Sequence, residues 1–207
     1  MAIDAYVKFI PYTGATPDSE SQVDFSNNNE DIAAPFKSSK VMTTANGMIS
    51  QFGQVFEIKD YSFDIEQTYN LGSQSGGAGA GKVTFNPFSI TRAIDRASPV
   101  FFEHACGGTA FQMVHLGLRK SGGAGASGST ETMTSGVFFL RFDFKLVVVK
   151  TISWSHDDES PQETVTFEYG GLQIRYAAQN PNGSLYATKA GGWNRVQNKQ
   201  DVLPTPI

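Results

Sequence analysis

The sequence predicts a mainly β fold, a barrel or sandwich, with one short helix. Several segments alternate apolar and polar residues, which is typical of strands with one buried face. Some of these segments change phase at a Gly or Pro, as bulges in a strongly curved or closed sheet do. The 21 glycines and 9 prolines among 207 residues are enough to separate many short strands, but too few for a disordered chain. We therefore expect a single domain over residues 1–207.

The clearest strand signal lies at residues 137–150. The middle of one face carries three charged residues, Arg141, Asp143 and Lys145. Because burying an uncompensated charge is costly, we expect these three side chains to point away from the barrel core. The other face is apolar and is expected to be buried; it consists of Phe138, Leu140, Phe142, Phe144, Leu146 and Val148.

The remaining predicted strands are shorter or bent. Residues 3–9 alternate regularly, whereas segments 55–66, 83–90 and 164–176 each change phase along their length. In the last of these the change falls at Gly170-Gly171. Paired glycines at such a point indicate a β-bulge.

One helix of about two turns is expected. Ser98 can act as its N-cap and Pro99 suits the first helical position. Phe102 and Cys106 are four residues apart and would share the buried face, with Cys106 as a small core residue. A glycine pair at 107–108 would end the helix.

Three segments have the composition of loops: 11–50, 72–81 and 121–136. The first is long for a connection within a compact domain, and connections of that size usually carry a function. We expect residues of about 15–50 to form an extra arm outside the barrel core, and 121–136 to form a flexible loop.

The composition excludes several classes of function. A formal charge of −4 is unsuited to nucleic-acid binding, which needs a basic surface. No apolar run approaches the ~18 residues of a membrane span and no signal peptide is apparent, so we expect a cytoplasmic chain without membrane insertion. Charged residues make up only 17% while Phe occupies 16 positions, which indicates much apolar surface in a core or between subunits.

No motif supports an enzyme, a cofactor or a metal site. Residues 76–82 read Gly-Gly-Ala-Gly-Ala-Gly-Lys, but Val83 replaces the hydroxyl residue of a phosphate-binding loop, and a strand follows where a helix is needed. Two histidines and Cys106 do not complete a tetrahedral zinc site. The acidic run at 156–161 is better explained as a turn between two strands.

Four segments, in order along the chain, resemble the Hcp family, the haemolysin-coregulated proteins that form the inner tube of bacterial type VI secretion systems. They are residues 1–8, Gly81-Lys82-Val83-Thr84-Phe85-Asn86-Pro87-Phe88, Ile94-Asp95-Arg96-Ala97-Ser98-Pro99 with the helix after it, and Gly191-Gly192-Trp193-Asn194-Arg195-Val196-Gln197-Asn198-Lys199. The resemblance implies a two-sheet β-barrel with one helix at its side. The arm at 15–50 and the loop at 121–136 depart from the family pattern.

The resemblance also implies a function. Subunits of this family form homohexameric rings, which stack into a hollow tube that leaves the cell without a signal peptide and carries small effectors in its lumen. The partners would be further copies of the chain and the sheath, spike and effector proteins of the apparatus. A secreted ring or effector chaperone acting outside such an apparatus is an alternative, and a ligand-binding or hydrolytic β-barrel domain is a third.

Three sets of residues have expected roles in such a ring. Trp193, with Gly192 and Asn194, would anchor the C-terminal segment by burying the indole ring. The charged face of 137–150 would look toward the lumen or an adjacent subunit. The arm would contact a neighbouring subunit, so that deletion of residues 19–46 leaves a folded barrel. Its contact residues would be Phe25, Ile32, Phe36, Val41 and Met42.

Overall fold

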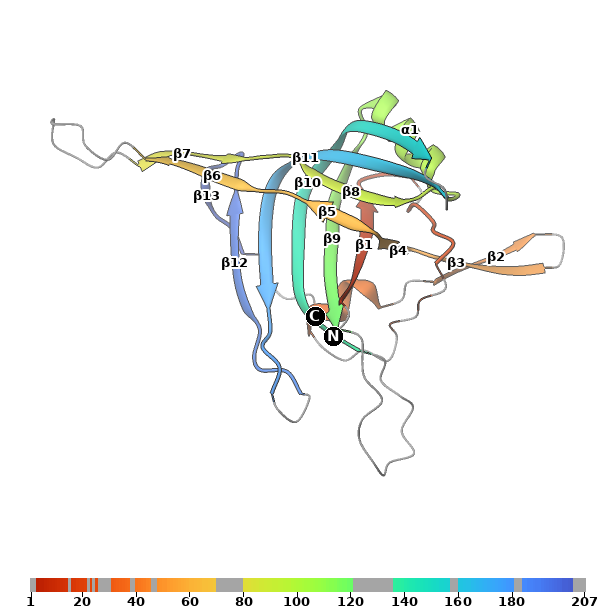
Figure 1. Cartoon of the computed structure of the whole chain (residues 1–207), viewed down its shortest axis with the longest axis horizontal. Helices are drawn as coiled ribbons and strands as arrows, with labels where there is room; N and C mark the ends of the chain where they lie inside the picture. Colours follow the sequence, from red (N-terminus) through yellow and green to blue (C-terminus); the bar gives the residue numbers. More distant parts are fainter. Residues whose placement is uncertain are drawn as a thin grey trace, which may run out of the picture.

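The structure is a computed structural model, and it describes most of the chain. The residues it describes are 3–14, 16–21, 23, 25, 31–37, 40–45, 48–69, 80–120, 136–156, 160–180 and 184–202. They form a mainly β fold with one α-helix at the side of the barrel (Figure 1), as the sequence predicts. Within these ranges, no helix has the length and apolar character needed to cross a membrane.

Most strands belong to one curved antiparallel sheet. Its order is β13-β12-β11-β10-β9-β1-β4, and β8 pairs with both β11 and β5. The strands are β1 (Ile3–Pro11), β4 (Val55–Ile58), β5 (Asp60–Ser62), β8 (Phe88–Ala93), β9 (Ala110–Lys120), β10 (Val137–His156), β11 (Pro161–Tyr176), β12 (Lys189–Asn194) and β13 (Lys199–Gln200).

The sheet closes into a barrel because β11 changes partner along its length. Its first half, Gln162–Phe167, pairs with β8, and its second half, Gly171–Tyr176, pairs with β12. On the far side, β4 leads through Lys59 into β5, which pairs with β8. Since β8 pairs with β11 on one edge and with β5 on the other, it links β11 to the end of the sheet at β4 and closes the barrel. In Figure 1, β10 and β11 bend over the top of the barrel.

Two hairpins project from this barrel on opposite sides (Figure 1). One consists of β2 (Lys40–Ala45) and β3 (Met48–Gly53), and the other of β6 (Ile65–Tyr69) and β7 (Ala80–Phe85). Because β6 continues from β5 and β7 leads into β8, the second hairpin is an extension of the barrel wall.

The face that β10 turns toward the core changes at Leu146. Phe144 and Val147 are both buried in the barrel, whereas Leu146 between them is 44% exposed and has a φ of +50°. Leu146 lies against Gly170 of β11, where a Cβ would come within 3.1 Å of the leucine side chain. The phase change predicted at Gly170-Gly171 is thus present. The prediction that Leu146 belongs to the buried face is wrong, because β10 bends at the same level.

The barrel interior is filled with aromatic rings. Phe9 meets Phe101 of the helix α1 (Ser98–Gly107) with 4.8 Å between ring centroids. Phe88 stacks on Phe144 at 4.2 Å. All four side chains are fully buried, so a large share of the Phe content lies inside one barrel. Such ring pairs stabilise beyond their buried area by about 0.5–1.5 kcal/mol each.

A second apolar cluster lies under the 3-10 helix η1 (Asp31–Phe36). Phe25, Ile32 and Phe36 from the long connection pack there against Tyr6 and Phe138 of the barrel wall, and none of the five is more than 4% exposed. The rings of Phe36 and Phe138 stack at 4.8 Å. The prediction that Phe25, Ile32 and Phe36 contact a neighbouring subunit is therefore wrong: a short apolar turn covers the barrel of its own chain.

The other expectations for the loops fall on residues that the structure does not describe. Val41 and Met42 lie in β2, and their side chains are outside the described part. Residues 70–79 and 121–135 are outside it as well. The acidic run at 156–161 connects β10 to β11, and its members 157–159 are likewise not described.

Candidate functional site

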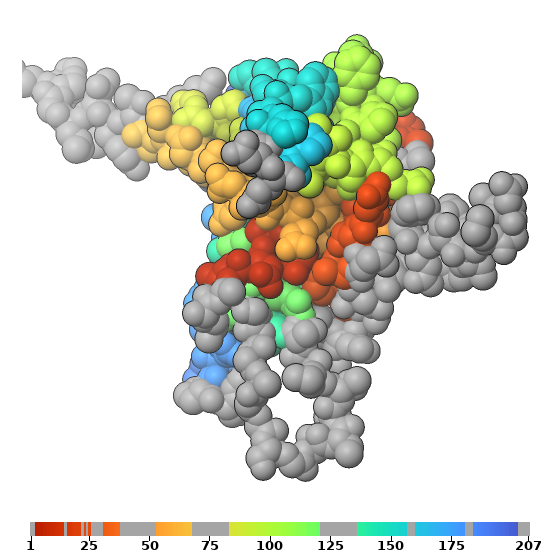
Figure 2. Space-filling model, turned by 45° about the vertical axis from the view of Figure 1, so that its right-hand side comes forward, coloured from red at the N-terminus to blue at the C-terminus, as the bar shows by residue number. Residues whose placement is uncertain are grey.

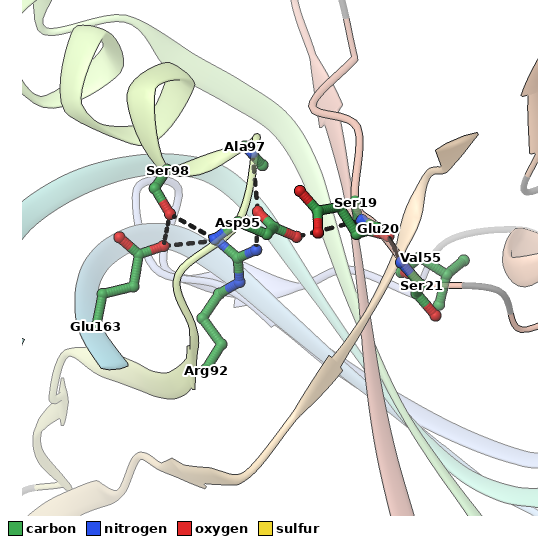
Figure 3. Close-up of polar contacts among 9 residues, drawn as sticks. All are labelled: Ser19, Glu20, Ser21, Val55, Arg92, Asp95, Ala97, Ser98 and Glu163. Carbon is green, nitrogen blue, oxygen red and sulfur yellow. Dashed lines mark hydrogen bonds and ion pairs between the residues drawn. The ribbon is translucent and has the colours of Figure 1, made fainter. Parts of the chain in front are cut away.

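The start of α1 is fixed by a buried polar cluster, drawn in Figure 3. Arg92 of β8 donates from Nη1 to Oε1 of Glu163 at 2.6 Å and forms a second ion pair with Asp95. The Ser98 hydroxyl donates to the same glutamate oxygen at 2.9 Å. Arg92 and Glu163 are 2% and 0% exposed. Removing one member of such a pair leaves an unpaired buried charge, which makes the cluster a strong positional restraint.

This cluster also joins α1 to other elements. Asp95 accepts the backbone N–H of Ala97 at 2.8 Å and that of Glu20 at 3.4 Å. The Arg92 guanidinium lies 4.7 Å from the ring centre of Phe56. The prediction that Ser98 is the N-cap is wrong: the N-cap is Ala97, and the Ser98 hydroxyl bonds to Glu163. At the other end, α1 stops at Gly108 with a φ of +63°, as the glycine pair predicts.

The outer side of α1 carries an exposed aromatic pair. Phe101 points into the barrel, and the next residue, Phe102, is 51% exposed. Its ring lies 6.4 Å from that of Trp154, near the end of β10, which is 53% exposed. The predicted buried face of the helix is therefore wrong, and Cys106 is exposed as well. We call Phe102 and Trp154 the aromatic ridge.

An open apolar cleft of about 780 Å³ lies between the β6–β7 hairpin and the strands β11 and β12. Ile65 and Val83 lie on one side, and Leu172, Ile174 and Trp193 lie on the other. Ile65, Ile174 and Trp193 are each 37–44% exposed. The prediction that Trp193 is a buried anchor is wrong, because its ring borders this cleft. We call this feature the apolar cleft.

The C-terminal segment is held instead by Asp201. Its backbone N–H donates to Gly192 O at 3.1 Å, and its carboxylate accepts from Lys145 Nζ at 2.6 Å and from the Asn194 amide at 3.5 Å. Gly192 has no space for a Cβ, because one would collide with the carbonyl of Asp201. Of the three residues predicted to anchor this segment, the structure thus places Gly192 and Asn194 in contact with Asp201.

The charged face of β10 is buried beneath η1. Arg141 and Asp143 are 1% and 0% exposed. Arg141 donates to the carbonyl of Ile32 at 2.8 Å and to Asp143 Oδ2 at 3.1 Å. Arg175 lies 3.7 Å from both Asp143 and Asp31. As predicted, these side chains lie outside the apolar barrel. Arg141 and Asp143 face η1 of their own chain, however, and not a lumen. Lys145 is partly buried and forms an ion pair with Asp201.

His115 completes this cluster, and its role follows from its position. Its Nδ1 lies 2.5 Å from Asp143 Oδ1, and because an ionised carboxylate only accepts, the imidazole is the donor. Burial lowers the pKa of His115, and the hydrogen bond to Asp143 offsets this only in part. Burial alone would raise the pKa of Asp143, but the His115 hydrogen bond and the Arg141 charge outweigh it and leave that pKa lowered. Neutral His115 and ionised Asp143 therefore form a fixed pair that supports η1.

Arg92 and Asp95 border an open pocket of about 570 Å³ that Glu20 and Glu57 also line, whereas Arg141 and Asp143 are buried under η1. The Arg92 cluster fixes α1, and the Arg141 cluster fixes η1. Within the described ranges, no three His, Cys, Asp or Glu side chains are placed to hold a metal ion. Two exposed surfaces, the aromatic ridge and the apolar cleft, are apolar, which suits contact with another protein.

Comparison with known proteins identifies the fold. The profile of a family described as "Type VI secretion system effector, Hcp" matches residues 47–176. Among solved structures, a type six secretion system protein aligns with a TM-score of 0.69 at 20% identity, covering 97% of this chain and 100% of that one. Hcp1 from Salmonella typhimurium aligns with a TM-score of 0.61 at 21% identity, with the same coverage. No curated protein matches the sequence.

Proposed function

The chain belongs to the Hcp family, the tube proteins of type VI secretion systems, and we propose that its copies form homohexameric rings that stack into a tube. The family match carries this proposal. It spans β3 to β11, and so includes most of the barrel wall and α1.

The surface of the chain supports a protein that functions by self-association. Phe102, Trp154 and Trp193 are large, partly exposed aromatic side chains, and such residues are enriched where proteins bind one another. The buried charges, in contrast, are used to fix elements of the fold. A ring needs two different surfaces on each subunit, and this chain exposes apolar side chains at two separate places, the ridge and the cleft.

The proposal extends to the route of the ring. The assembled tube would be driven out of the cell by the type VI apparatus, so that sheath and spike proteins are its partners and no signal peptide is required. Small effectors would travel in the lumen of the rings. Both statements rest on family membership and describe a structural carrier, not an enzyme.

The test is direct observation of the assembly. Purified protein should elute at six times the 22.4 kDa of one chain when its mass is measured by light scattering. Negative-stain electron microscopy should show rings with an open centre. A mass of one chain at all micromolar concentrations, with no rings on the grid, would refute the proposal.

A further inference from the structure

Two exposed apolar surfaces of opposite shape lie on different sides of the chain. The aromatic ridge stands out on α1 and the adjacent end of β10, whereas the apolar cleft opens between the β6–β7 hairpin and β12. Figure 1 shows α1 and the cleft-forming strands on opposite sides of the barrel. Figure 2 shows α1 as a projection at the edge of the molecule. The ridge therefore cannot fill the cleft of its own chain.

We infer that the aromatic ridge of one copy packs into the apolar cleft of the next copy, and that this contact repeats around the ring. The inference rests on the proposed function and adds to it the two surfaces that meet. It commits to a second copy of this chain because a head-to-tail contact needs one surface and its unlike complement on every subunit. This chain carries both, one convex and one concave.

The chemistry of the two surfaces fits such a contact. Aromatic side chains that enter a pocket are the usual hot spots of protein interfaces. The cleft volume of about 780 Å³ is large enough to receive aromatic side chains. Contact with Phe102 and Trp154 would bury the exposed apolar area of Ile65, Ile174 and Trp193 away from water.

Part of each surface is held in place by the fold of its own chain. The buried Arg92–Glu163 pair fixes α1, and β12 is held by its pairing with β11 and by Asp201. A preformed surface loses little conformational entropy on binding, so more of its contact free energy appears as affinity.

Charge substitutions at each surface test the contact. Trp154→Lys should remove the ridge and Trp193→Lys should remove the cleft, each weakening assembly about 30-fold or more, as expected for a hot-spot residue. Phe102→Lys is a second ridge variant, and Ile174→Lys a second cleft variant, in case one substitution affects folding. Tyr186→Lys is the matched control, because Tyr186 is 58% exposed and lies outside both surfaces. Circular dichroism and thermal melting verify that each variant is folded.

Mixing the variants tests which surfaces meet. A ridge variant keeps its cleft and a cleft variant keeps its ridge, so an equimolar mixture should form dimers and nothing larger, while each variant alone stays monomeric. The protein has two tryptophans, one in each surface. In the single-tryptophan variants Trp154→Phe and Trp193→Phe, the fluorescence of the remaining indole should shift to shorter wavelength on assembly in both cases.

The outcomes separate this inference from the proposed function. If the parent forms rings and the folded ridge variants do so too, the inference is refuted and the ring stands. If only the cleft variants fail, the cleft receives a different partner, and if the mixture gives no dimer, the two surfaces do not meet; both results also refute the inference. A parent that remains monomeric refutes both proposals.

Discussion

Replacing Phe36 by Ala tests whether the long connection belongs to the core of its own chain. Phe36 is fully buried, stacks on Phe138 with 4.8 Å between ring centroids, and meets Phe25 edge-on at 6.5 Å. Truncating a buried Phe costs about 3–5 kcal/mol through lost transfer free energy and the cavity left behind. Against a total stability of about 5–15 kcal/mol, this is a large loss.

The effect is measured as a change in the free energy of unfolding. For a domain of this size, a loss of about 3–5 kcal/mol lowers Tm by roughly 6–20 °C, at about 2–4 °C per kcal/mol. Denaturant titrations at several protein concentrations separate this loss from any change in assembly. Tyr186→Ala, at an exposed position, should stay within about 0.5 kcal/mol of the parent.

A loss below about 1 kcal/mol for Phe36→Ala, together with weaker ring formation, would contradict this reasoning. That pattern would mean that η1 packs on a neighbouring subunit, as the sequence alone suggested. A chain lacking residues 19–46 also loses part of this packing. Because the deletion removes Phe25, Ile32 and Phe36 from the second cluster, we now expect it to impair folding.

Three further substitutions test the polar and steric parts of the structure. Below a pH of about 6.5 the unfolded chain protonates His115 while the folded chain, with its lowered pKa, does not, so the free energy of unfolding should decrease as the pH is lowered. His115→Gln should make this decrease smaller, as measured by denaturant titration from pH 7.5 to 5.5. Gly117→Ala should cost about 1–3 kcal/mol, seen as a lower Tm, because its Cβ would lie 2.6 Å from the Phe36 ring. Arg92→Met should cost about 3–5 kcal/mol by leaving Glu163 buried without its cation, whereas the exposed Arg96→Met should cost less than about 1 kcal/mol in the same melting assay.

Features set by local chemistry could be predicted from the sequence. The strand at 137–150 follows from its two-residue period, and the change of phase between Tyr169 and Leu172 from the paired glycines, although the register shift between β10 and β11 lies at Val149/Thr151 and not at Gly170. The end of α1 at Gly108 follows from the freedom of glycine to adopt a positive φ. Each of these depends on residues close together along the chain.

Features set by distant partners could not be predicted. In the sequence, Arg141 and Asp143 have the pattern of a solvated face. The group that covers Arg141, the carbonyl of Ile32, lies 109 residues away along the chain, so the local pattern does not show that these charges are buried. The spacing of Phe102 and Cys106 predicts the wrong buried face for α1, since spacing alone does not tell which side of a short helix meets the barrel. The sequence predicts Trp193 as a core residue, and only the position of the β6–β7 hairpin opposite β12 shows that it borders a cleft.

The pairing of β1 also affects how the protein emerges from the ribosome. One edge of β1 pairs with β4, whose residues follow soon after it, but the other edge pairs with β9, where Ile3 lies opposite Lys120. At about 5–20 residues per second, synthesis takes on the order of 6–20 s to reach Lys120 after Ile3. During that time one edge of β1 and its apolar face have no partner in the barrel, and an unpaired strand edge is a site for aggregation. We therefore expect the yield of folded chain to depend on protection of β1 until β9 has been made.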